Sequence, residues 1–246
     1  MSIINYLSVK KYTLSFKEMI KYDKIPNIKK SLKRLKELGF LPEVIYDIGA
    51  YEGEFTDLCL ELWNNTFIFS FEALPKKAEK LRDKYKNKNV IVKEAIVGED
   101  NQKNVGFFSD ETASSVLRSA EVYSKKSLLS QEMISLNSFI IIDKNKSPNF
   151  LKIDTQGYEF PILLGCSEIL ENIEVILVET NFIEIYEKVH LANEVIAYLA
   201  KFNFVIFDIC EIHRRPLDNA LFQIDFLFIK KDSKWRENKK WNNPLI

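Results

Sequence analysis

The stretch Val44-Ile45-Tyr46-Asp47-Ile48-Gly49-Ala50-Tyr51-Glu52-Gly53 decides the fold of this chain. Its first half has the mainly apolar composition of a buried strand, and the residues that follow Gly53 have the composition and spacing of a helix. A strand, a turn with two glycines and a helix N-terminus form a nucleotide-sized pocket, because glycine lets the backbone approach a ligand and the first helical N–H groups are free. The alternative is an ordinary strand–turn–helix corner.

A second apolar stretch, residues 67–71, ends in Glu72. A carboxylate at this place can accept both hydroxyls of a ribose. The turn reads Asp-x-Gly-x-x-x-Gly instead of the Gly-x-Gly-x-x-Gly of dinucleotide sites, and an acid at the strand end would repel a pyrophosphate. S-adenosylmethionine carries an ammonium, a sulfonium and a ribose but no phosphate, so the sequence predicts this cofactor.

Length and composition set the broad class. The chain has 246 residues, 46% hydrophobic and 28% charged, which suits one α/β domain with an extension. Its net charge of zero argues against a nucleic-acid-binding protein. No apolar run approaches the ~20 residues of a membrane span, and the N-terminus does not resemble a signal peptide. Cys59, Cys166 and Cys210 lie far apart in apolar contexts, which predicts reduced thiols and a cytoplasmic protein.

Strand-like and helix-like stretches alternate, which predicts a parallel doubly wound sheet. Strands are expected at 44–48, 67–71, 90–93, 150–153, 175–178, 204–207 and 223–229, with weaker candidates at 103–108 and 132–136. Helices are expected after Gly53, at 76–85, from Pro161 to Gly165 and at 193–201. No helical pattern separates the last two strands, so we expect a hairpin and an antiparallel edge strand.

The chain divides into three parts. Residues 1–41 form a helical extension that packs on the domain or, alternatively, mediates dimerisation. Residues 42–231 form the cofactor-binding domain. The tail, 232–246, mixes Trp235 and Trp241 with lysines, which allows contact with a membrane surface, although a solvated tail is the simpler interpretation.

Several segments together resemble the FkbM family of S-adenosylmethionine-dependent methyltransferases. They are the Asp47-x-Gly-x-x-x-Gly turn, Phe71-Glu72, Ser114-Ser115, Leu151-Lys152-Ile153-Asp154-Thr155-Gln156-Gly157-Tyr158-Glu159, Leu163-Leu164-Gly165 and Glu179. The resemblance covers roughly residues 43–230, and the stretch 151–159 is its most specific part. It implies the class I methyltransferase fold, a Rossmann-like three-layer sandwich whose seven-stranded sheet is mostly parallel with an antiparallel last strand. It also implies O-methylation of a sugar hydroxyl in a glycan, or of a natural product.

The same resemblance implies the cofactor contacts. The methionine end would lie at the turn, and the ribose and adenine would lie at the ends of the second and third strands. The implied residues are Asp47, Gly49, Ala50, Tyr51 and Gly53 in the turn, Glu72 and Ala73 at the ribose, Glu94 and Ala95 at the adenine, and Asp154 at the methyl group. The small polar loop 112–117, with Ser115, is suited to lining the cleft or is simply a surface loop.

Methyl transfer to a hydroxyl needs alignment with the C–S bond and a group that accepts the hydroxyl proton. Candidates for that group are Asp154, Glu159, Glu179, His190 and His213. Asp154 comes first, because ligands bind beyond the carboxyl ends of strands. Lys152, on the same strand face, could pair with Asp154, steady a developing alkoxide, or belong to a buried structural ion pair.

Two further groups of polar residues leave alternatives open. Glu179 and Asn181, with Asp154, offer oxygens suited to Mg²⁺ or Ca²⁺, but the set lacks a second adjacent acid, so a metal is possible and not assigned. Arg214 and Arg215 could bind an anionic glycan or be solvated on a loop.

Three rival functions are less well supported. A dinucleotide-dependent oxidoreductase lacks its glycine motif, and a non-catalytic binding module would not need Asp47, Gly49 and Glu72. For amino-group methylation of nucleic-acid bases, Asn-Pro-Pro-Tyr or its acidic variant is expected where this chain has residues 154–157, Asp-Thr-Gln-Gly. The sequence therefore predicts an O-methyltransferase that acts on a carbohydrate.

Overall fold

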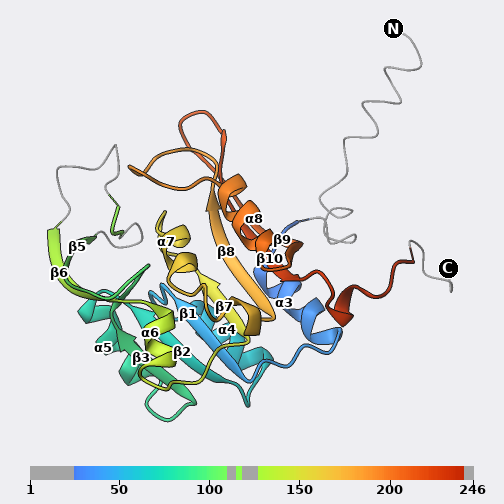
Figure 1. Ribbon diagram of the computed structural model, residues 1–246, viewed down its shortest axis with the longest axis horizontal. Coiled ribbons are helices and arrows are strands. Elements are labelled where there is room, and N and C mark those ends of the chain that lie inside the picture. The colour runs from blue at the N-terminus through green and yellow to red at the C-terminus, as the bar shows by residue number, and fades with distance from the viewer. Residues whose placement is uncertain (1–24, 110–114, 118–126, 241–246) are drawn as a thin grey trace, which may run out of the picture.

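A computed structural model describes residues 25–109, 115–117 and 127–240 (Figure 1). Its centre is a seven-stranded sheet with the order β3-β2-β1-β7-β8-β10-β9. The strands are β1 (Val44–Ile48), β2 (Phe67–Glu72), β3 (Val90–Glu94), β7 (Phe150–Ile153), β8 (Val175–Asn181), β9 (Phe204–Arg214) and β10 (Leu221–Lys230). Six of the expected strands begin where predicted, because each is a short apolar run bounded by polar or turn residues.

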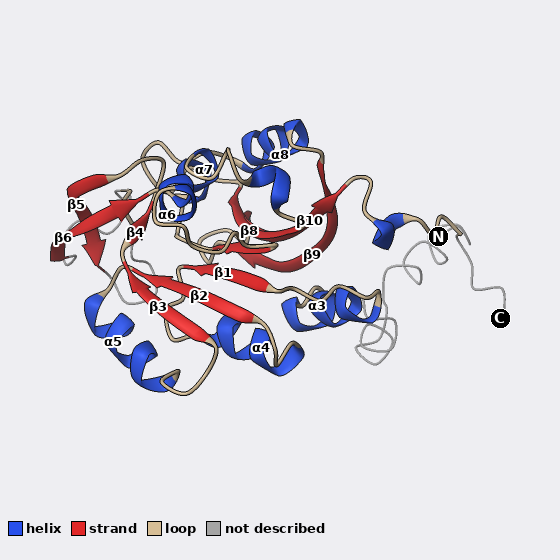
Figure 2. Ribbon diagram, turned by 60° about the horizontal axis from the view of Figure 1, so that its bottom comes forward, coloured by secondary structure: helices blue, strands red, loops and turns tan. Residues whose placement is uncertain are grey.

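Helices cover both faces of this sheet (Figure 2). On one side lie α3 (Ile28–Glu37), α4 (Glu54–Leu62) and α5 (Pro75–Lys84). On the other lie α6 (Leu136–Ile141), α7 (Glu159–Leu164) and α8 (Ala192–Lys201). Alternate residues of β1 serve the two layers: Ile45 packs with the first set and Tyr46 with the second. The predicted three-layer α/β sandwich with a mostly parallel seven-stranded sheet is confirmed.

The expected hairpin is present, but its last strand is not at the edge. β10 is antiparallel to both β8 and β9 and lies between them. Burial explains this order, because β10 is mostly buried whereas Ile206, Ile209 and Ile212 of β9 are exposed. The edge strand is therefore β9, and it is longer than the predicted 204–207.

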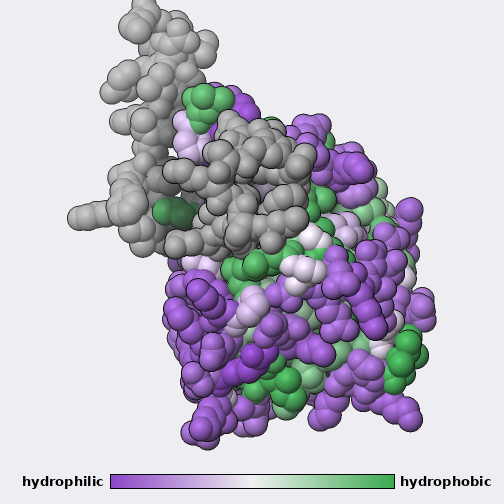
Figure 3. Space-filling view, turned by 90° about the vertical axis from the view of Figure 1, so that its left-hand side faces the viewer, coloured by the Kyte–Doolittle hydropathy of each residue, from purple (hydrophilic) through white to green (hydrophobic). Residues whose placement is uncertain are grey.

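A second, three-stranded sheet occupies the region that the sequence left irregular. It has the order β4-β6-β5, from β4 (Ile96–Val97), β6 (Ser127–Ile134) and β5 (Gln102–Ser109). The strand expected at 132–136 ends earlier, because Ser135 accepts a hydrogen bond from the backbone N–H of Ser138 and caps α6. On this side of the molecule, hydrophobic residues are visible among hydrophilic ones (Figure 3).

The N-terminal helix α3 packs on the sheet. Asn27 caps its start, and Gly39, with φ +94°, ends it while the N–H of Phe40 bonds to the carbonyl of Leu35. Leu32 and Leu35 are fully buried in the cluster that includes Ile45. The remainder of the predicted extension, residues 1–24, lies outside the described residues.

Part of the predicted tail also packs on the domain. The Trp235 ring, in the 3₁₀ turn η2 (Lys234–Arg236), meets the Phe40 ring edge-on with a centroid distance of 5.0 Å. Trp235 therefore packs against the domain, and Trp241 lies outside the described residues.

Two other expectations concern the cysteines and membrane spans. Cys59, Cys166 and Cys210 are all described, all buried and all free thiols. In the described part of the chain, no helix has both the length and the apolar character needed to cross a membrane.

Candidate functional site

Two adjoining pockets lie at the carboxyl ends of the central strands. The first is bordered by the end of β2, by β4 and β5, and by Val116. The second lies between the start of α3 and the ends of β8, β9 and β10. They share Gly49, Tyr51, Asp154 and Gln156, so they form one cleft with a common neck.

Gly49 lets two strands end close together. Its φ is +77°, and a Cβ atom at this position would overlap the carbonyl oxygen of Asp154. The N–H groups of Gly49 and Ala50 both donate to the carbonyl oxygen of Phe71. Gly53, in contrast, is not among the residues lining either pocket: it precedes α4, and a side chain there would collide with Tyr85.

Two non-glycine residues at the neck adopt left-handed backbone conformations. Tyr51 has φ 49° and Gln156 has φ 56°. Such conformations cost free energy in residues with a Cβ atom, and they concentrate at ligand sites. The rigid loop around Gln156 is held by Glu159, whose carboxylate accepts hydrogen bonds from the N–H groups of Thr155 and Gly157.

Glu72 is buried at the end of β2 and lines the first pocket. Its two carboxylate oxygens accept hydrogen bonds from the N–H groups of Tyr51 (2.7 Å) and Leu74 (2.8 Å). Burial raises the pKa of Glu72, and these two hydrogen bonds offset only part of the increase. The carboxylate is thus fixed in orientation, and each oxygen retains a lone pair for a ligand.

Asp47 does not reach the cleft. It is fully buried beneath the turn, where one oxygen accepts a hydrogen bond from Thr56 (2.8 Å) and the other lies 3.1 Å from the Lys152 ammonium. Lys152 also donates to the carbonyl oxygen of Gly49 (2.9 Å). Burial lowers the pKa of Lys152, but the Asp47 and Asp154 carboxylates raise it by more. Of the predicted roles for Lys152, this geometry matches the buried ion pair.

Asp154 lies at the neck, with its side chain 45% exposed. Gln156 donates a hydrogen bond to it (3.3 Å), and the ammonium of Lys152 is 3.7 Å away. Glu179 is buried in the second pocket and accepts a 2.6 Å hydrogen bond from Gln223. Burial and the neighbouring carboxylates, Asp154 among them, raise the pKa of Glu179 well above its ordinary value.

Carboxylates lie side by side across the last three strands. In the strand register, Asp225 of β10 is opposite Glu179 of β8 and also opposite Glu211 of β9. Gln223, two residues before Asp225, is opposite His213. The His213 Nε2 atom lies 3.5 Å from Glu211 and 3.9 Å from Asp225. Interaction with Asp225 raises the pKa of His213, while partial burial lowers it by less.

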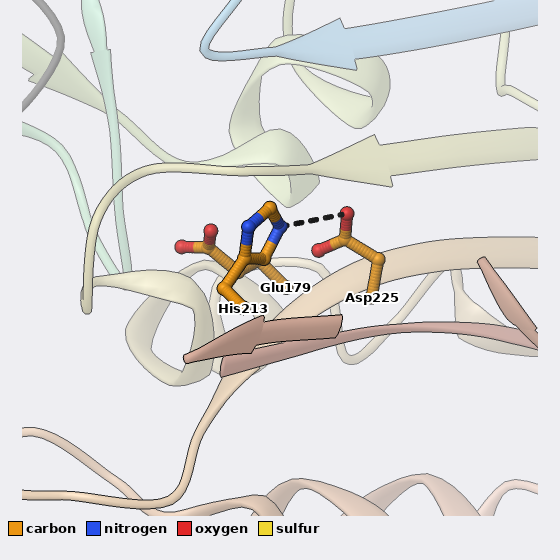
Figure 4. Close-up of side chains that lie close together, drawn as sticks. All are labelled: Glu179, His213 and Asp225. Atoms are coloured by element: carbon orange, nitrogen blue, oxygen red, sulfur yellow. Dashed lines mark ion pairs between the residues drawn. The ribbon is translucent and has the colours of Figure 1, made fainter. Parts of the chain in front are cut away.

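The imidazole of His213 lies between the carboxylates of Glu179 and Asp225 (Figure 4). One potential ligand atom from each of the three residues falls within 4.8 Å of the others. The oxygen set considered from the sequence is not gathered in the same way, because Asn181 lines neither pocket. Asp225 is not among the predicted site residues, although an acid inside the apolar stretch 221–230 is a usable signal.

Three predicted site residues, His190, Glu94 and Ser115, have side chains that form other interactions in the structure. His190 stacks on Phe160 with a centroid distance of 4.1 Å and pairs with Glu194, and neither pocket includes it. Glu94 pairs with Arg82 at 2.9 Å on the outside of β3. In this structure the side chains of His190 and Glu94 face partners that the local sequence does not reveal, so neither is brought to the cleft.

The Ser115 hydroxyl accepts a hydrogen bond from the N–H of Leu117. The residue of this loop that lines the first pocket is its neighbour Val116. Arg214 and Arg215 hold the β9–β10 hairpin through Asn219 and Asp218. The remaining predicted residues do border the cleft: Ala50, Tyr51, Ala73 and Ala95.

Comparisons with known proteins agree with this architecture. The model of the methyltransferase FkbM domain matches residues 47–206. A search of curated proteins finds no match. Among solved structures, the precorrin-6y C5,15-methyltransferase of Geobacter metallireducens is 15% identical with a TM-score of 0.44, covering 85% of this chain and 95% of its own.

A second solved structure is the 1,6-didemethyltoxoflavin-N1-methyltransferase of Burkholderia thailandensis with bound S-adenosylhomocysteine. It is 11% identical with a TM-score of 0.44, over 94% of this chain and 92% of its own. Similarities this low do not indicate a shared acceptor. The family match spans more than half of the chain and includes the glycine turn and the Asp154 loop. The chain therefore belongs to the FkbM methyltransferase family and is an S-adenosylmethionine-dependent methyltransferase.

Proposed function

We propose that this enzyme transfers a methyl group to a hydroxyl of a carbohydrate. The observation that carries the proposal is the position of Asp154, a half-exposed carboxylate at the neck shared by the two pockets. The second pocket is otherwise rich in carboxylate and amide groups that accept hydrogen bonds from sugar hydroxyls. A natural-product hydroxyl is the alternative acceptor.

The charges of the second pocket disfavour an acidic acceptor. Among the described residues that line it, the cationic side chains apart from His213 are Lys29 and Lys152. Lys29 pairs with Glu61 at 2.7 Å, and Lys152 pairs with Asp47. Among these described lining residues, both lysines already pair with an acid, so neither is left to bind a substrate carboxylate. This supports an acceptor with a neutral hydroxyl.

In this proposal the adenosine of the cofactor occupies the first pocket. Glu72 accepts the ribose hydroxyls, and Ala95, Ile96 and Phe107 supply apolar contacts to the adenine. The methionine end passes Gly49 toward the second pocket, so the reactive methyl group lies at the neck. Asp154 then accepts the proton of the acceptor hydroxyl while its oxygen attacks the methyl carbon in line with the C–S bond.

Transfer of a labelled methyl group tests the proposal. Purified enzyme with S-adenosylmethionine is offered oligosaccharides and sugar nucleotides, and the product linkage is determined by NMR. A methyl ether resistant to mild alkali is the expected product. An alkali-labile methyl ester, an N-methyl product, or transfer to RNA or DNA only would overturn the assignment.

Substitution Glu72→Ala is expected to weaken binding of S-adenosylhomocysteine at least ~10-fold, a loss of about 1.4 kcal/mol. The reason is the loss of a carboxylate that is already oriented by two backbone N–H groups. Calorimetric titration measures the effect. Glu94→Ala is the matched control, because Glu94 is opposite Glu72 in the sheet but faces Arg82. Equal affinities of both variants would contradict the role of Glu72.

A further inference from the structure

The row of acids in the second pocket lacks a matching positive charge. Glu179, Asp225 and Glu211 occupy directly opposite positions on three neighbouring strands. Like charges placed opposite one another destabilise a sheet. Among the described residues that line this pocket, Lys152 pairs with Asp47, and the basic side chain that lies within 4.0 Å of the row is the imidazole of His213.

The side chains of this row are held in place by amides. Gln223 is buried and donates to Oε2 of Glu179 at 2.6 Å. Gln156 donates more weakly to the same oxygen (3.4 Å), so both of these hydrogen bonds go to Oε2 and neither uses Oε1 of Glu179. Carboxylates that bind metal ions are commonly oriented by hydrogen bonds of this kind.

The spacing of the ligand atoms is close to that of a metal site. With metal–ligand bonds of ~2.2 Å, two ligand atoms of one ion lie at most ~4.4 Å apart. The atoms of Glu179, His213 and Asp225 lie within 4.8 Å of one another, so small side-chain rotations close the set. Figure 4 shows the three side chains close together, with the imidazole beside both carboxylates.

We propose that Glu179, His213 and Asp225 bind a divalent transition-metal cation at the acceptor end of the cleft. The imidazole favours ions such as Mn²⁺, Fe²⁺ or Zn²⁺ over Mg²⁺ and Ca²⁺, which prefer oxygen ligands alone. Glu211 adds negative charge beside the site without belonging to the closest set.

The cation has a chemical use that rests on the proposed function. A hydroxyl oxygen bound to a divalent cation loses its proton more readily. The proton passes to Asp154, the oxygen forms a bond to the methyl carbon, and the C–S bond breaks to leave neutral S-adenosylhomocysteine. The site itself is tested without the acceptor, so the two proposals fail independently.

The chain has only two histidines, which makes NMR decisive. In the full-length protein labelled with ¹⁵N-histidine and freed of metal with a chelator, Zn²⁺ is expected to shift the imidazole signals of His213 and leave those of His190 unchanged. Mn²⁺ should broaden the His213 signals first. Equal responses of both histidines, or no response, would overturn the proposal, and this measurement requires no substitution.

Calorimetry with Zn²⁺ and Mn²⁺ then identifies the ligands. His213→Gln, Glu179→Gln and Asp225→Asn are each expected to weaken binding more than 10-fold, and Gln223→Ala by roughly 10- to 100-fold. His190→Gln is the matched control and retains wild-type affinity. Undiminished binding by His213→Gln would overturn the site. Full methyl transfer after chelation, with metal binding demonstrated, would overturn only the role in the reaction.

Discussion

Replacing Lys152 with methionine is expected to lower the free energy of unfolding by about 3–5 kcal/mol, because the substitution leaves a charged partner buried and uncompensated. That partner is Asp47, which is fully buried with its carboxylate 3.1 Å from the Lys152 ammonium. The same ammonium holds the carbonyl oxygen of Gly49. Loss of this hydrogen bond therefore also loosens the turn that borders both pockets. Urea denaturation followed by circular dichroism measures the change.

An exposed ion pair provides the control. Lys84 lies 2.6 Å from Asp57, and both side chains are at least 40% exposed. Lys84→Met should cost no more than about 1 kcal/mol, because solvent screens such pairs. In the double variant Asp47→Asn with Lys152→Met, part of the loss should be recovered, since no charge is then buried alone. If Lys152→Met costs no more than Lys84→Met, the ion pair does not hold the turn.

Asp154→Asn is expected to lower kcat by roughly 10²- to 10⁴-fold, the usual contribution of a positioned proton acceptor. The amide keeps the shape of the side chain, and the hydrogen-bonded frame from Gln156 remains on the oxygen side. The affinity for S-adenosylhomocysteine should change little, since Glu72 and the backbone of the neck are untouched. Single-turnover methyl transfer and calorimetry separate the two quantities.

Asp218→Asn serves as the control for this substitution, because Asp218 pairs with Arg215 in the β9–β10 hairpin and lies outside both pockets. A wild-type kcat for Asp154→Asn would exclude Asp154 as the proton acceptor. A parallel loss of cofactor affinity would instead indicate that Asp154 orients the cofactor.

Local sequence signals were sufficient for the strands and the turn that border the first pocket. The strand Val44–Ile48 and the strand that ends in Glu72 begin where the apolar runs of the sequence begin. The two glycines, Gly49 and Gly53, adopt the positive φ values of the turn. Apolar runs set strands, and glycine permits φ values that other residues avoid. The fold class and the family were therefore accessible from sequence.

Local sequence signals did not predict which residue a given side chain contacts. Glu94 and His190 carry suitable chemistry, yet their side chains pair with Arg82 and Glu194. The pattern of one segment gives the face of a strand or helix but not the residues packed against it. Asp47 shows the same limit, because its partner Lys152 comes from the neighbouring strand β7.

The sequence by itself determined the methyltransferase fold, the cofactor class and the neck residues Gly49 and Asp154. Only the tertiary structure decided the composition of the second pocket. Asp225 meets Glu179 and His213 because β10 inserts antiparallel between β8 and β9. That pairing depends on which strand is buried on both faces, a property of the whole sheet that no single segment encodes.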